Sequence, residues 1–311
     1  MASTPASEQL AHLERAVAVA GLEPVELVLP EEREAALGGI RLHWVDWGTV
    51  GRPPVVFLHG GGLTARTWDL VCLPLRGDHH CVAPDARGHG DSEWSPGLDY
   101  GAQTLVGDLE RLVEHLGLER PVLVGQSLGG MTALAYARDR PAAVAGLVLV
   151  DVVTEVQRAG TDRILAFAAG PSELDSVEAF VERARAFNPA RDPRLLRRSL
   201  LHNLRQLPDG RWTWKYDPRA ITRERFEALH AGLRDLSEGL DAVTCPTLVV
   251  RGADSDVVSP EAAEAFARTL PDARVVTVPA AGHTVQGDNA RGFVAALRPF
   301  LSERRAAYPV G

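Results

Sequence analysis

Short runs of consecutive apolar residues recur along the chain, and longer stretches with apolar residues at every third or fourth position separate them. The runs predict strands buried on both faces, as in a parallel sheet, at residues 55–58, 81–83, 122–124, 147–150, 247–250 and 274–278. The periodic stretches predict helices at 103–116, 128–138, 260–270 and 290–305. This alternation indicates an α/β protein with a mostly parallel, doubly wound sheet.

The first residues and the middle of the chain depart from this alternation. Residues 1–24 predict a helical or frayed lead-in, and two strands are expected at 25–29 and 40–47 with a turn at Gly38-Gly39. Between about residue 152 and residue 240 the pattern is mostly helical, at 158–168, 174–187, 193–204 and 223–233, and an aromatic stretch at 212–216 interrupts it. The alternation resumes after residue 246, which favours an insertion into one domain.

We therefore expect three parts. They are a lead-in (1–24), an α/β core made of 25–151 and 241–311, and a helical cap (152–240) inserted into that core. A cap in such a sheet would lie above the carboxyl ends of the strands, where ligands bind in open α/β folds.

Composition narrows the class of protein. The 311 residues include 33 Lys+Arg and 41 Asp+Glu, a net charge of −8, and 45% are hydrophobic, which is typical of a soluble globular protein. The acidic balance gives no reason to expect nucleic acid or an anionic membrane as a partner. The first 24 residues do not resemble a signal peptide, and no apolar run is long enough to span a membrane, so a cytoplasmic location is expected.

Two residue types argue against whole classes of chemistry. Lys215 is the only lysine. This argues against Schiff-base or pyridoxal chemistry, since both need a reactive lysine amine. The cysteines at 72, 81 and 245 are odd in number, far apart and without a CxxC pair, so free thiols are expected and neither a disulfide nor a metal site.

The strongest chemical signal is Gly125-Gln126-Ser127-Leu128-Gly129-Gly130, directly after a predicted strand and directly before a predicted helix. A nucleophilic serine needs a tight, strained turn that lifts its hydroxyl clear of the backbone, and flanking glycines allow the close backbone approach. The helix that follows would direct its N–H groups toward a forming anion. We therefore predict that Ser127 is a nucleophile.

Two further loops supply what such a serine requires. His59-Gly60-Gly61-Gly62 follows a predicted strand, and its N–H groups, with that of Leu128, could stabilise an oxyanion; Leu128 and either Gly61 or Gly62 are the predicted donors, and His59 is expected to brace the loop. His283, in Ala281-Gly282-His283 after the last predicted strand, lies where a general base is needed late in the chain. The segment 85–92 is interpreted as a structural loop.

Taken together, these motifs resemble those of the α/β-hydrolase superfamily over about residues 25–305. The resemblance implies the α/β-hydrolase fold, with the cap following the strand after the nucleophile helix, and a Ser-His-acid triad of Ser127, His283 and an aspartate. The usual acid position falls at Ser255, so Asp254 or Asp256 would have to substitute. Some members carry the acid one strand earlier, where this chain has Asp151, and Asp151 is the favoured candidate.

The expected function is a serine hydrolase that cleaves a small or medium, mainly apolar ester, lactone or thioester through an acyl-enzyme, without metal or cofactor. The cap aromatics would shape its pocket or pack the cap: Phe167, Phe180, Phe187, Trp212, Trp214, Tyr216 and Phe226. Ser127 argues against epoxide and haloalkane hydrolysis. The alternatives are a carbon–carbon bond hydrolase for vinylogous diketones, a cofactor-free perhydrolase and a non-catalytic small-molecule receptor. The expected partner is a small-molecule substrate, and a homodimer is compatible with the sequence.

Overall fold

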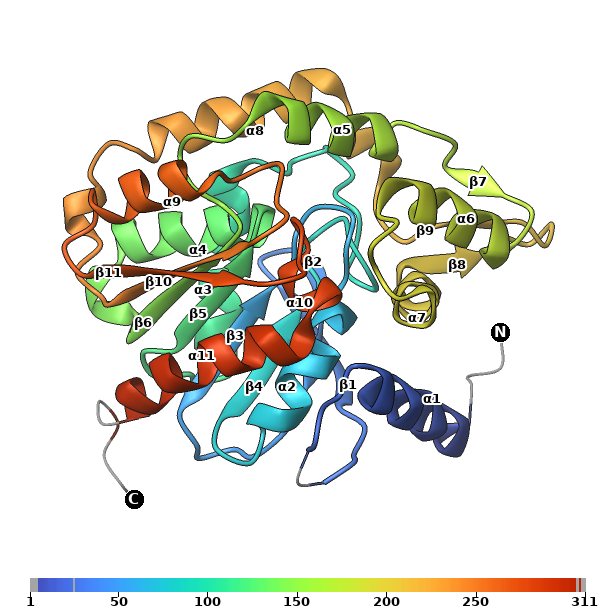
Figure 1. The fold of residues 1–311 in the computed structure, drawn as a ribbon, viewed down its shortest axis with the longest axis horizontal. Helices are drawn as coiled ribbons and strands as arrows, with labels where there is room; N and C mark the ends of the chain where they lie inside the picture. Colours follow the sequence, from blue (N-terminus) through green and yellow to red (C-terminus); the bar gives the residue numbers. More distant parts are fainter. Residues whose placement is uncertain (1–4, 25, 306–307, 309–311) are drawn as a thin grey trace.

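An eight-stranded sheet forms the centre of the computed structural model, which describes residues 5–24, 26–305 and 308 (Figure 1). Its strands lie in the order β1-β2-β4-β3-β5-β6-β10-β11. The β1–β2 and β2–β4 pairs are antiparallel and all other pairs are parallel. The strands are β1 (Glu31–Leu37), β2 (Ile40–Asp46), β3 (Pro54–Leu58), β4 (His80–Pro84), β5 (Val122–Gln126), β6 (Gly146–Val150), β10 (Thr247–Gly252) and β11 (Ala273–Val278).

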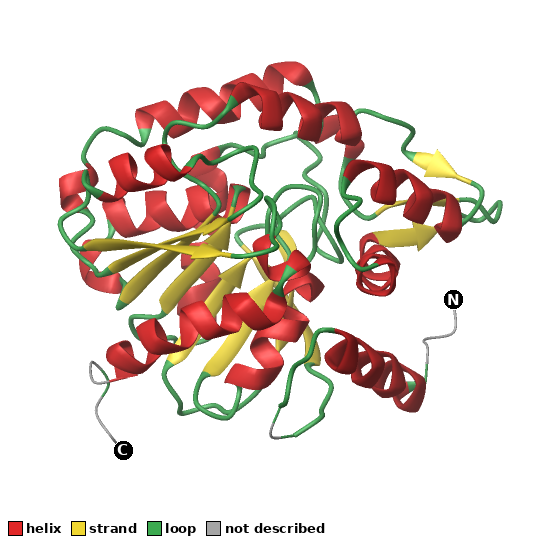
Figure 2. Cartoon of the chain, viewed as in Figure 1, coloured by secondary structure: helices red, strands yellow, loops and turns green. Residues whose placement is uncertain are grey.

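Helices cover both faces of this sheet (Figure 2) because its central strands are apolar on both sides. Successive side chains of a strand point to opposite faces. Val55 and Phe57 accordingly pack with α1 (Ala6–Val19), α2 (Asp69–Leu75) and α11 (Ala290–Arg305). Val56 and Leu58 pack with α3 (Ala102–His115), α4 (Leu128–Asp139) and α9 (Pro260–Ala267). The α/β-hydrolase architecture expected from the sequence is confirmed.

The start of the sheet corrects one expectation. Residues 26–29 form no strand, and Val25 lies outside the described residues. Leu27, Val28 and Leu29 instead pack as an irregular segment against the core. The first strand is β1, whose side chains are largely exposed at the sheet edge, so its sequence lacks the apolar alternation that would have revealed it. Gly38 and Gly39 make the predicted turn to β2 with φ of 62° and 81°.

The segment between β6 and β10, residues 152–240, is called the cap here. It comprises α5 (Arg158–Ala168), β7 (Glu173–Leu174), α6 (Val177–Phe187), α7 (Pro193–Asn203), β8 (Leu204–Gln206), β9 (Trp212–Trp214) and α8 (Arg223–Asp235). In Figure 1, α5 and α8 run across the top of the view, and α6, α7 and the small sheet lie to the right. The division into lead-in, core and cap as separate units stays a prediction.

The small sheet of the cap, ordered β7-β9-β8, was not expected from the sequence. Its strands are two or three residues long, too short for a periodic signal. Trp214 and Tyr216 from the aromatic stretch are buried in a separate hydrophobic cluster with Phe180 of α6 and Leu200 of α7. Several of the cap aromatics therefore hold the cap together.

The remaining elements are short. A four-residue helix, α10 (Val285–Asp288), follows the loop that carries His283. Four 3₁₀ helices occur at η1 (Ala65–Trp68), η2 (Pro141–Ala143), η3 (Pro218–Ala220) and η4 (Leu240–Ala242). None of the helices in the described part of the chain combines the length and the apolar character that a membrane crossing requires. The three cysteines are free and buried.

Candidate active site

Ser127 occupies a sharp turn between β5 and α4. Its φ of 50° and ψ of −115° lie in a region that non-glycine residues rarely adopt. The flanking glycines explain how the turn closes: a Cβ on Gly125 would lie 2.3 Å from the carbonyl oxygen of Gly129, and one on Gly129 would lie 2.3 Å from that of Leu58. The glycines thus let the helix pack directly onto two strands while the serine takes the strained position.

Asp151 holds the imidazole of His283. The Asp151 Oδ2 lies 2.8 Å from the His283 Nδ1, and the carboxylate is fully buried at the end of β6. It also accepts hydrogen bonds from the backbone N–H of Gly252 (3.1 Å, to Oδ1) and from the Ser255 hydroxyl (2.6 Å, to Oδ2). These donors stabilise a buried carboxylate that would otherwise lose its hydration.

The other two acidic candidates are placed differently. Asp256 forms an ion pair with Arg163 of α5 at 2.7 Å, and Asp254 lines the central cavity. Among the described residues, neither forms a hydrogen bond or an ion pair with the His283 ring. Of the three aspartates weighed from the sequence, Asp151 is the one that the fold brings to the imidazole.

Ser255, which stands at the usual acid position of the family, has a role that sequence reasoning missed. Besides donating to Asp151, its Oγ accepts hydrogen bonds from the backbone N–H groups of Val257 (3.1 Å) and Val258 (3.2 Å). The hydroxyl therefore links the Asp151 carboxylate, directly after β6, to the loop after β10. The sequence showed only that an expected aspartate was absent.

Gln126, immediately before Ser127, joins the serine turn to two other loops and was also missed. Its side chain is buried, and its Nε2 donates to the backbone carbonyl of His283 at 3.2 Å. Its Oε1 lies over Gly60, where a Cβ would come within 1.9 Å. A larger residue at Gly60 would push this amide away, so the glycine loop, the serine turn and the histidine loop fit together through one side chain.

The predicted oxyanion donors lie around the same space. Gly61, Gly62 and Leu128 line the cavity together with Ser127 and His283. Within the described residues, the backbone N–H groups of these three donors have no hydrogen-bond acceptor, and Leu128 opens α4, where helix N–H groups are unpaired. The three groups are thus available to an incoming oxygen.

His59 braces this loop, as expected. Its Nδ1 lies 2.8 Å from the carbonyl oxygen of Gly60, and its Nε2 accepts from the backbone N–H of Ala86 at 3.0 Å. Burial lowers the pKa of His59, so the ring stays neutral and serves one donor and one acceptor.

The cavity has a volume of about 570 Å³ and lies between the core and the cap. Most of its lining is apolar, from residues such as Leu105, Met131, Ile164 and Leu229. Four of the seven cap aromatics singled out from the sequence contribute to the lining: Phe167, Phe187, Trp214 and Tyr216. Phe180 is fully buried in the cap cluster and Trp212 packs beside it, whereas the side chain of Phe226 lies outside the described residues.

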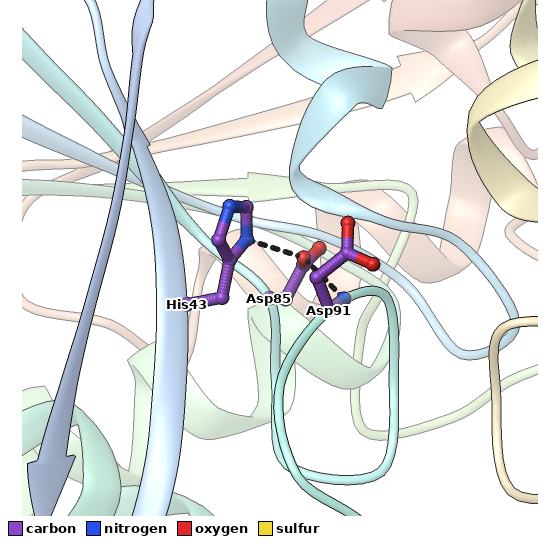
Figure 3. A group of neighbouring side chains, drawn as sticks. All are labelled: His43, Asp85 and Asp91. Carbon is purple, nitrogen blue, oxygen red and sulfur yellow. Dashed lines mark hydrogen bonds and ion pairs between the residues drawn. The ribbon is translucent and has the colours of Figure 1, made fainter. Parts of the chain in front are cut away.

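The segment 85–92 forms the loop expected from the sequence, and Figure 3 shows two of its residues, Asp85 and Asp91, beside His43. Asp85 accepts hydrogen bonds from the backbone N–H groups of Ala65 (2.6 Å) and Asp91 (2.9 Å), and its Oδ2 lies 2.8 Å from the His43 Nδ1. His43, Asp85 and Asp91 are close enough to suggest a metal site. However, the His43 Nε2 bonds to Glu32 and the Asp91 carboxylate pairs with Lys215, so these groups already satisfy one another.

The interactions of His43 with Asp85 and Glu32 should make the free energy of unfolding depend on pH. Burial alone would lower the pKa of His43, but its hydrogen bonds to Asp85 and Glu32 outweigh burial and raise the pKa from 6.5 to about 9. A histidine with a raised folded-state pKa stabilises the fold fully below its unfolded pKa and loses that contribution as the pH rises through the folded value. The contribution is at most roughly 3 kcal/mol at 1.36 kcal/mol per pKa unit.

We therefore expect His43→Gln to lower the free energy of unfolding most near pH 6, with a deficit that shrinks toward about pH 10. Urea unfolding of both proteins across this range measures it. His12→Gln, which alters a side chain that is 41% exposed, is the control and should show no such trend. A deficit of the same size at every pH would contradict the assignment.

Comparison with known proteins finds relatives that are similar over most of the chain. Residues 55–296 match the model of the alpha/beta hydrolase family. The esterase Rv0045c of Mycobacterium tuberculosis is 36% identical over 89% of this chain and 91% of its own length. The crystal structure of that esterase has a TM-score of 0.75, and the match covers 97% of this chain and 99% of the esterase chain.

Two further proteins cover most of the chain. The sn-1-specific diacylglycerol lipase ABHD11 of Mus musculus is 32% identical over 82% of this chain and 83% of its own. The structure of E-2-(acetamidomethylene)succinate hydrolase has a TM-score of 0.79 at 26% identity, covering 88% of this chain and 99% of that one. The family model alone spans well over half of the sequence, so this chain belongs to the alpha/beta hydrolase family.

Proposed function

We propose that this protein is a serine hydrolase that cleaves carboxylic esters, with Ser127 as nucleophile, His283 as general base and Asp151 as the acid. The observation that carries the proposal is the 2.8 Å contact between Asp151 and the His283 Nδ1. This contact leaves the Nε2 of the ring free to act as a base, and the ring lines the same cavity as Ser127. Relatives named esterase and diacylglycerol lipase, similar over most of the chain, support the same reaction class.

The mechanism follows from the hydrogen bond that occupies one of the two nitrogens of the His283 ring. Asp151 accepts a hydrogen bond from the His283 Nδ1–H, so the neutral ring presents the Nε2 lone pair as a base. His283 takes the proton of the Ser127 hydroxyl as the oxygen attacks the ester carbonyl, and then returns that proton to the leaving alcohol. Water deprotonated by the same nitrogen then attacks the acyl-enzyme, and His283 returns this proton to the Ser127 oxygen as the acid is released.

The oxyanion would be stabilised by the N–H groups of Leu128 and of Gly61 or Gly62. Each donor of this kind contributes roughly 3–4 kcal/mol to the transition state because it is already oriented and needs no reorganisation. Their lack of acceptors within the described residues supports this role. Leu128 directly follows Ser127 in the chain, which supports its N–H as the first donor.

The cavity supports small to medium esters with an apolar body. A volume of about 570 Å³ is in the range of ligand-sized pockets, and its aliphatic and aromatic lining favours hydrocarbon groups. The cytoplasmic location and the lack of a nucleic-acid partner, both inferred from the sequence, remain parts of the proposal, and a homodimer stays compatible with it. Three free, buried cysteines are consistent with a reducing compartment.

Covalent trapping tests the proposal. A fluorophosphonate probe should label the protein once, and peptide mass spectrometry should place the adduct on Ser127, because only an activated serine attacks such a probe at neutral pH. The Ser127→Ala protein should stay unlabelled, and a short p-nitrophenyl ester should protect the native protein. Labelling at another residue, or none at all, would refute the assignment of the nucleophile.

A further inference from the structure

Arg191 is a buried arginine that the proposed reaction leaves without a task. It lies in the cap between α6 and α7, lines the cavity, and its side chain is only 10% exposed. Its Nε is buried without a hydrogen-bond partner, and within the described residues no acceptor bonds to any of its guanidinium nitrogens. A guanidinium carries five donors, so burying it without acceptors is costly unless something else supplies them.

The nearest carboxylate, Asp288, does not satisfy it. The Arg191 Nε and the Asp288 Oδ1 are 3.9 Å apart, which is too far for a hydrogen bond. Asp288 is already used elsewhere: its Oδ1 accepts from the Asn188 side chain at 2.9 Å and its Oδ2 from the backbone N–H of Gly282 at 3.0 Å. Asp288 therefore stabilises the histidine loop and the cap, and leaves the Arg191 donors unused.

Other arginines around the cavity differ in this respect. Arg87 is paired with Asp108, Arg163 with Asp256, and Arg225 donates to the carbonyl of Leu98 at 2.9 Å. Burial lowers the pKa of Arg191, and the nearby positive charge of Arg198 lowers it further, while Asp288 opposes both effects. An additional anion beside Arg191 would thus stabilise its buried positive charge.

The position of Arg191 relates it to the reaction centre. Its Nη2 would lie 2.8 Å from a Cβ on Gly287, so the guanidinium packs against α10, the helix that begins two residues after His283. Gly282, His283, Thr284, Asp288 and Arg191 line one continuous cavity with Ser127. A molecule bonded to Ser127 would therefore share this cavity with the guanidinium.

We propose that Arg191 binds a carboxylate of the substrate, so that the preferred esters carry a free acid group on the acyl chain away from the scissile bond. The inference rests on the proposed ester hydrolysis and names its substrate class. A planar guanidinium pairs with a carboxylate through two parallel hydrogen bonds, which gives direction as well as affinity. The apolar lining would hold the chain between the acid group and the ester.

A matched pair of substrates tests this: mono-p-nitrophenyl adipate, which has a free carboxylate, and its methyl ester, which does not. The native enzyme should prefer the acid through a lower KM. Arg191→Gln should raise KM for the acid by about 10- to 100-fold, the range for a hydrogen-bonded ion pair, and change the methyl ester by no more than about twofold. Arg191→Lys should recover part of the preference.

Arg163→Gln is the control, because it removes a cavity arginine that already has an acceptor; it should affect both esters alike. Thermal unfolding should show that Arg191→Gln is folded, since it removes a charge without hydrogen bonds. Adipate alone should raise the Tm of the native protein and of Ser127→Ala, but not that of Arg191→Gln.

The outcomes separate the two proposals. If the native enzyme hydrolyses the methyl ester but does not prefer the acid, or if Arg191→Gln slows both esters equally, the role of Arg191 is wrong and ester hydrolysis stands. If neither ester is hydrolysed and adipate still raises the Tm through Arg191, the anion site stands and the proposed reaction fails.

Discussion

Ser127→Ala is expected to reduce kcat for p-nitrophenyl butyrate by about 100,000-fold or more, the scale seen when a nucleophile that acts with a base is removed. The hydroxyl makes no hydrogen bond among the described residues, so its loss should leave the fold intact. The measurement is turnover near neutral pH, with the Tm of both proteins as a check on folding. If the alanine protein kept even a tenth of native kcat, Ser127 would not be the nucleophile.

Asp151→Asn is the second large effect, with an expected loss of about 1,000- to 10,000-fold in kcat. An amide of the same shape carries no negative charge to pair with the His283 Nδ1–H. The ring therefore loses its preferred tautomer and the stabilisation of its protonated form. Turnover of the same ester measures the loss. Because Gly252 and Ser255 also donate to this carboxylate, some loss of stability should accompany it.

Asp254→Asn and Asp256→Asn are the matched controls for this experiment. Each removes one charge from the loop after β10 without touching the His283 ring, so each should retain kcat within about tenfold. A greater loss in either of them than in Asp151→Asn would transfer the role of the acid to that residue.

Ser255 offers a gain-of-function test of the same geometry. Its Oγ lies 2.6 Å from the Asp151 Oδ2, so a carboxylate introduced there would lie near the imidazole. Ser255→Asp in the Asp151→Asn background should restore part of the lost turnover. Ser255→Asn in that background supplies no negative charge and should not.

The fold was predictable because the central sheet imposes a strong requirement on the sequence. Strands such as β3 and β6 are buried on both faces and must be continuously apolar, which marks them without further information. The edge strand β1 has no such requirement, and its pairing with β2 depends on backbone hydrogen bonds that the residue pattern does not record. The strands of the cap were missed for another reason, because two or three residues are too few to give a periodic signal.

The candidate site was predictable where the chemistry imposes a local pattern. Ser127 is marked by its glycines, whereas Asp151 was predicted from the resemblance to the family, some of whose members carry the acid after this strand. Ser255, Gln126 and Arg191 were missed, because what matters about them is contact with residues far away in the chain: Ser255 with Asp151, Gln126 with His283, and Arg191 with the cavity. Nothing near them in the sequence indicates these contacts.

The cap leaves the sheet after β6 and returns to it at β10, and these two strands are hydrogen-bonded neighbours. An insertion whose two ends meet at adjacent strands can be exchanged without changing the order of any strand around it. In such an exchange Asp151, directly after β6, would remain part of the core, whereas Arg191 would be transferred with the cap. If Arg191 binds a substrate carboxylate as proposed, a chimera that carries this cap on another hydrolase core would gain the preference for acidic substrates and keep the host's own catalytic residues.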